Sequence, residues 1–259
     1  MKKARIWVNN LGEMYYLFIF VPEKYSMFAI MVMSNPLESH IKFWHPAEIE
    51  QAVLEVGMLP FFENDIPGFS VAEHTPAELW FSDEQDGPWE WKGPIIQLGH
   101  TAYGKFFNRK AGWVSLEWLP DLVNLRRAAY PLPPEDSQAP ERLIYEVLCL
   151  DRDVLSRDLK REVGLFGMKL KSTFERYIAQ LQMGLWACIS DFEYNIDQHG
   201  NRYGWGLARY STPEVMYGED FVRSVIGQRS PEESRQRLVE QLLKMLPMAT
   251  EKQVLRLLK

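Results

Sequence analysis

The chain has 259 residues, of which 46% are hydrophobic and 25% charged, with a formal net charge of −6 and nine tryptophans. This composition excludes an intrinsically disordered chain and supplies enough apolar side chains for one large or several small domains. The acidic balance also excludes a uniformly basic coat for nucleic acid, so any contact with a polyanion has to come from a local patch.

The beginning of the chain imitates a leader or membrane segment. Basic residues precede two apolar runs, but Pro22 divides them and neither half reaches the ~18–20 apolar residues that span a bilayer. We therefore predict an N-terminal extension, residues 1–34, and no membrane partner. Met33 resembles a natural start, so our hypothesis is that residues 1–32 are an upstream extension of the true reading frame. The alternative is an edge hairpin within residues 6–21.

Residues 35–135 are predicted to form an aromatic-rich α+β domain. Apolar residues at helical spacing, with a proline in the first turn and a glycine after the last, predict a helix over residues 46–57. Aromatic residues on both sides of a polar turn predict a β-hairpin over residues 102–116. Residues 119–127 are also compatible with a helix.

An acidic, tryptophan-rich loop lies between these elements, at residues 82–94. Glu90 stands between Trp89 and Trp91, and a carboxylate held against an indole can act as a general acid. Two other interpretations stay open. The loop can be a solvated acidic turn anchored by core tryptophans, or it can be a surface for a protein partner.

The segment after the proline-rich linker, residues 130–140, has the element order of a winged helix, a variant of helix-turn-helix. Three helices and two strands are expected, at residues 141–150, 157–163, 173–183, 185–192 and 203–210. Ser156 and Ser172 are the expected N-caps of the second and third helices. We predict a winged-helix domain over residues 136–216 and a helical C-terminal tail over residues 217–259.

A capping box at Ser230 begins that tail. The tail suits internal packing, a protein partner or a homo-oligomer contact.

A winged helix places its third helix in the major groove of DNA and its ribbon against the backbone. Lysine and arginine neutralise phosphates, hydroxyls donate to phosphate oxygens, and Gln180 could read a base edge. The candidate nucleic-acid-binding residues are Lys169, Lys171, Ser172, Thr173, Arg176, Gln180, Arg202, Tyr203, Lys105, Lys110 and Arg126. Because acidic residues nearly balance basic ones across residues 141–183, the module could instead serve only as a scaffold.

Other chemistries find less support. Residues 99–105 nearly spell a phosphate-binding loop, but Phe106 stands where the magnesium-binding hydroxyl belongs. The five histidines lack the spacing of a metal site. Cys149 and Cys188 fall at apolar positions, which predicts buried, reduced thiols and a cytoplasmic location. We expect neither a metal nor a cofactor.

Several short strings carry a resemblance to a known family. They are WEWKGP at residues 89–94, YGKFF at 103–107, GWVSLEW at 112–118, QLQM at 180–183 and YGWG at 203–206. From about Ser39 to its end, the chain resembles bacterial AlkZ-related proteins, which are akin to winged-helix DNA glycosylases. The resemblance implies DNA as the partner and alkylation-damage repair as the setting.

Those glycosylases use a Gln-apolar-Gln or Gln-apolar-Asp motif to position the water that attacks the sugar. Gln180 and Gln182 match the motif as a string, but here it ends the third helix of a later module instead of lying in the N-terminal part. Helix positions two apart point about 200° from each other, so one water cannot easily be held by both. Three functions stay open: DNA binding without catalysis, a monofunctional glycosylase using Gln180, Gln182 or Glu90, and a protein-interaction scaffold.

Overall fold

The computed structural model describes residue 37 and residues 42–82, 84–150, 153–167, 170–200 and 202–259. The predicted N-terminal extension lies outside these residues. The described residues belong to one compact unit, Pro36–Lys259. Within the described ranges, no helix is both long and apolar enough to cross a membrane.

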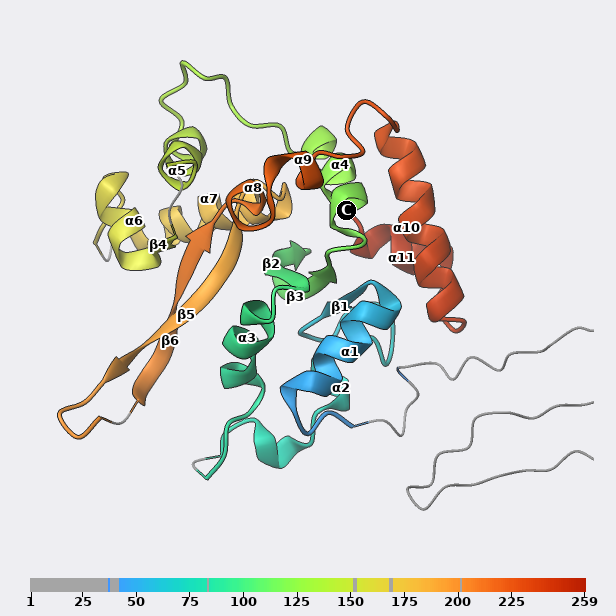
Figure 1. Ribbon diagram of the computed structural model, residues 1–259, viewed down its shortest axis with the longest axis horizontal. Helices are drawn as coiled ribbons and strands as arrows, with labels where there is room; N and C mark the ends of the chain where they lie inside the picture. Colours follow the sequence, from blue (N-terminus) through green and yellow to red (C-terminus); the bar gives the residue numbers. More distant parts are fainter. Residues whose placement is uncertain (1–36, 38–41, 83, 151–152, 168–169, 201) are drawn as a thin grey trace, which may run out of the picture. The chain divides into compact units, whose positions relative to one another are not determined.

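An antiparallel six-stranded sheet organises this unit, in the order β1-β3-β2-β5-β6-β4 (Figure 1). The strands are β1 (Met58–Pro60), β2 (Thr101–Phe107), β3 (Lys110–Ser115), β4 (Val154–Leu155), β5 (Cys188–Ile196) and β6 (Arg202–Ser211). The fold class is therefore α+β, as predicted. Tyr103 pairs with Ile189, so a single sheet joins the strands before the proline-rich linker to those after it.

The hairpin of β2 and β3 confirms the sequence prediction. Asn108 and Arg109 form its turn with φ angles of 50° and 62°. Two consecutive residues in the left-handed region are typical of the turn whose twist matches a two-stranded ribbon. Asparagine tolerates this conformation best among residues with a Cβ atom.

Five helical segments lie in the N-terminal half of the unit. They are α1 (Pro46–Val56), α2 (Val71–His74), the 3₁₀ helix η1 (Ala77–Leu79), α3 (Pro88–Gln97) and α4 (Leu119–Ala129). Helices α1 and α4 confirm the predicted ones. Helix α3 corrects the loop expected at residues 82–94, where Gly93 and Pro94 argue against a helix.

Local capping and burial explain why α3 forms. Pro88 occupies the first helical position, and the Glu90 carboxylate accepts the Gly87 N–H at 3.0 Å. Trp91 and Ile95 bury one face of the helix. A Cβ atom on Gly87 would lie 1.9 Å from the Leu79 carbonyl oxygen, so only glycine fits at the N-cap of α3.

Seven helices follow the linker among the described residues. They are α5 (Pro140–Leu148), α6 (Ser156–Glu162), α7 (Lys171–Met183), α8 (Pro213–Tyr217), α9 (Glu219–Val222), α10 (Pro231–Met245) and α11 (Glu251–Leu257). The capping box at Ser230 is confirmed. The expected caps Ser156 and Ser172 are wrong, because both lie inside the first turn and leucines without a capping side chain precede it.

One group of aromatic residues, around Phe61 and Trp113, forms a connected cluster. Trp113 is fully buried, with ring centroids 4.6 Å from Tyr103 and 5.7 Å from Phe61. Phe61 also packs 5.2 Å from Trp89 on α3, and Tyr103 lies 6.0 Å from Phe192 on β5. This cluster fixes α3 and the β5–β6 ribbon to the same core, which positions the surfaces described next.

Candidate nucleic-acid interface

Helix α7 has one buried and one exposed face. Phe174, Ile178 and Leu181 are buried in the core. Residues 172, 176 and 180 recur every four positions, which places them together on one side of the helix. The exposed residues of α7 are Lys171, Ser172, Arg176 and Gln180, and Thr173 is half-buried. Five of the candidate residues therefore share one helix, and four of them are exposed.

Arg176 is held in place by its neighbour in the chain. Its guanidinium donates to the Tyr177 hydroxyl at 2.8 Å and lies 4.6 Å from the centre of that ring. Stacking of this kind orients a guanidinium and leaves its other N–H groups directed at solvent. These donors are free to meet an anion such as a phosphate.

Glu175, the acidic residue of α7, is neutralised by two lysines. Lys160 on α6 lies 3.1 Å from its carboxylate and Lys105 on β2 lies 3.7 Å away. Together with Lys171 and Arg176, four cations accompany one carboxylate. Lys160 belongs to this group of cations but could not be predicted from the sequence, because its partner Glu175 is 15 residues away on another helix.

Gln182 serves the core and not the surface. Its Oε1 accepts the Lys105 backbone N–H at 2.9 Å, and its Nε2 donates to the Ile178 carbonyl at 3.1 Å. The side chain is fully buried, whereas Gln180 is exposed. The two glutamines therefore point to different environments, and they do not converge on one water.

Two other candidate residues have structural partners. Glu90 is half-buried, and its carboxylate caps α3. Arg126 corrects an expectation of surface exposure, since it is 1% exposed and donates to the Phe106 and Leu257 carbonyls at 2.8 and 3.3 Å. Burial lowers its pKa to about 10, against a smaller opposing effect of Tyr130. Arg126 links β2 to α11 and does not reach a ligand surface.

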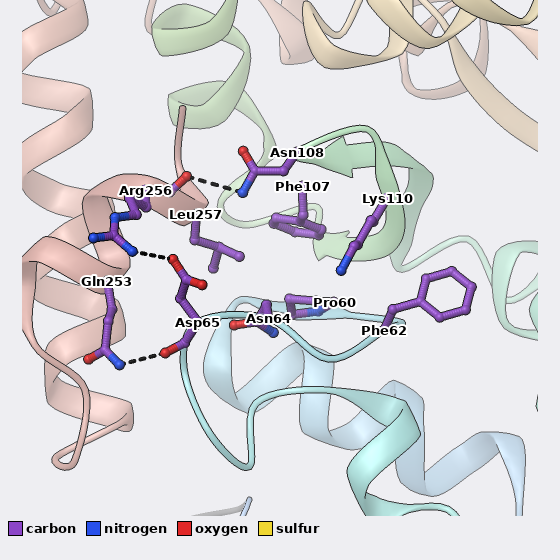
Figure 2. A pocket seen from close by; sticks show the side chains of 10 residues that line it. All are labelled: Pro60, Phe62, Asn64, Asp65, Phe107, Asn108, Lys110, Gln253, Arg256 and Leu257. Atoms are coloured by element: carbon purple, nitrogen blue, oxygen red, sulfur yellow. Dashed lines mark hydrogen bonds and ion pairs between the residues drawn. The ribbon is translucent and has the colours of Figure 1, made fainter.

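Lys110 borders a small cavity between the β2–β3 turn and α11 (Figure 2). Its ammonium donates to the Glu63 carbonyl at 2.9 Å, and Arg256 closes another side through an ion pair of 2.7 Å with Asp65. The volume of about 90 Å³ is well below the ~300 Å³ of a small-molecule site. We interpret this region as a packing contact between the β2–β3 turn, the segment after β1 and α11, and not as a ligand site.

A wider, open cavity of about 590 Å³ lies under the proline-rich linker, next to Trp186. Its arginines already have carboxylate partners. Arg127 and Arg223 both bind Glu214, at 2.6 and 3.1 Å, and Arg142 binds Glu146 at 2.8 Å. The cavity therefore presents no unmatched charge to a ligand.

Some expectations fall outside the described part of the chain. They concern Lys169 and the side chains of Arg202 and Tyr203. The backbone of β6 begins at Arg202, which pairs with Ile196 across the ribbon. Within the described ranges, no group of three or more histidine, cysteine or acidic residues could hold a metal ion.

The cysteines differ from the prediction at one position. Cys188 is buried, but Cys149 is exposed because α5 ends at Leu148 and turns the next side chain outward. Burial raises the pKa of both thiols above the ordinary value. Neither thiol has the lowered pKa of a reactive cysteine.

Comparison with known proteins places the chain in a family. No curated protein and no solved structure matches it. The family model described as AlkZ related matches residues 44–259, which include α7, the β5–β6 ribbon and the aromatic cluster. The chain belongs to the AlkZ-related family, as the resemblance in its sequence predicted.

Proposed function

We propose that this protein binds DNA through a winged-helix module, residues 136–216, in the repair of alkylation damage. The element order α5, β4, α6, α7, β5, β6 and the pairing of β4 with β6 support the module. Residues 35–135 then form the aromatic-rich domain that carries it, and residues 217–259 the helical tail. Membership of the AlkZ-related family supports the link to repair.

The exposed face of α7 is the observation that carries this proposal. Lys171, Ser172, Arg176 and Gln180 stand opposite the buried Phe174 and Ile178. Two cations provide phosphate contacts, Ser172 provides a hydroxyl donor, and Gln180 provides an amide for a base edge. The β5–β6 ribbon beside them would run along the DNA backbone.

The proposal does not require base excision by the glutamine motif. The Gln182 side chain is hydrogen-bonded to the backbone of Lys105 and Ile178, and the Glu90 carboxylate to the backbone N–H of Gly87. A glycosylase would need a polar group free to orient water at the sugar. Release of a modified base from alkylated DNA, lost in the Gln180→Ala variant, would support the enzymatic alternative.

Fluorescence anisotropy with a labelled duplex at low ionic strength tests DNA binding. Undamaged, alkylated and base-free duplexes should be compared over a salt series. We expect the Lys171→Ala/Arg176→Ala variant to bind more weakly and to show a salt slope reduced by about 0.9 for each lost phosphate contact. The matched control is Lys244→Ala/Lys252→Ala, which removes two exposed lysines of α10 and α11.

Equal loss in both double variants would locate the binding elsewhere. No salt-dependent binding of the unmodified protein to any of the three duplexes would end the proposal.

A further inference from the structure

Lys92 occupies an unusual environment where α3 meets the β5–β6 ribbon. Its ammonium nitrogen lies 4.3 Å from the centre of the Phe192 ring and 5.1 Å from that of Trp89. The side chain is half-buried. Among the described residues, this ammonium forms neither a hydrogen bond nor an ion pair.

Other enclosed cations of the described chain have oxygen partners. Lys160 and Lys105 face Glu175, and Arg127 is bound by Glu214. Even the buried Arg126 donates to two carbonyl oxygens. Lys92 has aromatic faces instead, and these compensate for the loss of water less completely than a carboxylate does.

This environment increases the share of the neutral amine relative to an exposed lysine. Burial lowers the pKa of Lys92 to about 8, although the charge of Glu90 acts in the opposite direction. A lysine that is partly unprotonated near neutral pH is a nucleophile toward carbonyl carbons. Lysine is therefore not interchangeable here with arginine, which stays charged.

Lys92 lies on a helix that packs along the β5–β6 ribbon, the element proposed to contact DNA. Helix α3 lies along β5, since Gln97 donates to the Ser190 carbonyl at 3.3 Å and the Tyr194 hydroxyl donates to the Trp89 carbonyl at 3.4 Å. Figure 1 shows α3 beside the ribbon, which continues past it. The amine thus stands at the side of the element that would contact the sugar-phosphate backbone.

We infer that Lys92 forms a reversible imine with the aldehyde of a base-free deoxyribose in DNA bound along the β5–β6 ribbon. This inference rests on the proposed DNA binding. Loss of an alkylated base leaves a sugar whose ring opens to an aldehyde at C1′, the carbonyl group that such damaged DNA itself presents. The inference therefore names base-free DNA as the preferred substrate class.

The chemistry requires no cofactor. The lone pair of the neutral Lys92 nitrogen adds to C1′ and forms a carbinolamine. The nitrogen loses a proton, the hydroxyl group leaves as water after taking up a proton, and a carbon–nitrogen double bond results. Borohydride then delivers a hydride to C1′ and converts the protonated imine into a stable secondary amine.

Borohydride trapping tests the inference directly. The full-length protein is incubated with a labelled duplex containing one base-free site, reduced, separated on a denaturing gel and mapped by mass spectrometry. We expect a cross-link at Lys92, reduced at least tenfold in Lys92→Arg and Lys92→Met. Lys244→Met is the matched control and should cross-link like the unmodified protein. Circular dichroism establishes that the variants are folded.

A second measurement needs no DNA. Limiting formaldehyde with cyanoborohydride at pH 7 should methylate Lys92 ahead of the exposed Lys244 and Lys252, as read by peptide mapping. If Lys92 reacts no faster than these two, the inference fails regardless of DNA binding.

The two proposals fail in distinguishable ways. Anisotropy that shows binding to base-free DNA, with trapping equal in the unmodified protein and Lys92→Met, would overturn the imine and leave DNA binding intact. Absence of binding to any duplex would overturn both proposals.

Discussion

The Gln182 side chain accepts the Lys105 backbone N–H at 2.9 Å, which joins the C-terminal half of α7 to β2 across 77 residues of sequence. Its amide nitrogen donates to the Ile178 carbonyl one turn earlier. A Cβ atom on Gly104 would lie 3.2 Å from the same Gln182 oxygen. The strand and the helix are therefore packed closely at this point, and the glutamine is part of the packing.

Gln182→Ala should destabilise the protein by about 1–3 kcal/mol, because it leaves the part-buried Lys105 N–H without an acceptor. Urea unfolding followed by tryptophan fluorescence measures the change. Gln180→Ala is the control on the exposed side of the same helix, and its effect should stay within about 0.5 kcal/mol. Equal effects of the two substitutions would contradict the different roles of the two glutamines.

Glu175→Gln should strengthen DNA binding. It removes the carboxylate that Lys105 and Lys160 now neutralise, so that both lysines can act on phosphates. We expect roughly a fivefold gain at low salt, equivalent to about 1 kcal/mol for one surface charge, and a gain that shrinks as salt rises. Glu232→Gln on α10 is the control and should not change affinity. A weaker complex with Glu175→Gln would mean that DNA does not approach α7.

The two thiols should react very differently in the native protein. Iodoacetamide should alkylate the exposed Cys149 and leave the buried Cys188 unmodified until denaturant is added. Because burial raises the pKa of Cys149 above its ordinary value, its labelling should accelerate as the pH is made more alkaline. Peptide mapping reads both sites, and Cys149→Ser should abolish native labelling. Labelling of Cys188 in the native protein would show that the β5 end of the sheet opens.

Local signals in the sequence were enough for many elements. Three of these signals act within a few residues: Pro46, the capping box at Ser230 and the turn at Asn108. The two helices and the hairpin that they predict are present. Helix α3 could not be predicted in this way. Gly93 and Pro94 oppose it locally, and the burial that stabilises it involves Phe61, which follows β1, and Phe192 on β5.

The candidate site shows the same division. The i, i+4 spacing on α7 correctly separated Arg176 and Gln180 from the buried Phe174. Arg126 could not be placed, because α4 is buried on nearly all sides and its arginine finds carbonyl partners 20 and 131 residues away. The environment of Lys92 could not be predicted from the sequence, because the Phe192 ring that it faces belongs to β5.

The half-buried charge of Lys92 also makes a prediction about stability. Its folded-state pKa is lowered to about 8, whereas the ordinary value is 10.5. Below pH 8 both states are protonated, and the folded state bears the full cost of the buried charge. Between pH 8 and 10.5 the unfolded state binds more protons, so stability rises with pH in this window. The nearby acidic groups are Glu90 on α3, whose charge acts on Lys92, and Asp191 on β5, whose carboxylate lies next to Gly93. Neither acidic residue is substituted in the experiment described next.

Lys92→Met should therefore be at least as stable as the unmodified protein at pH 7, and the difference should shrink toward pH 9.5. The upper limit is about 3.5 kcal/mol, at about 1.4 kcal/mol for each pKa unit of the shift from 10.5 to about 8, and solvent screening at a half-buried site reduces it. Urea unfolding at both pH values measures the change, with Lys252→Met on α11 as the control for the removal of an exposed lysine. The comparison of variant with unmodified protein cancels the ionisation of tyrosines. A stability difference that stays constant from pH 7 to pH 9.5 would show that Lys92 is charged throughout, and the amine would then lack the neutral form that imine chemistry requires.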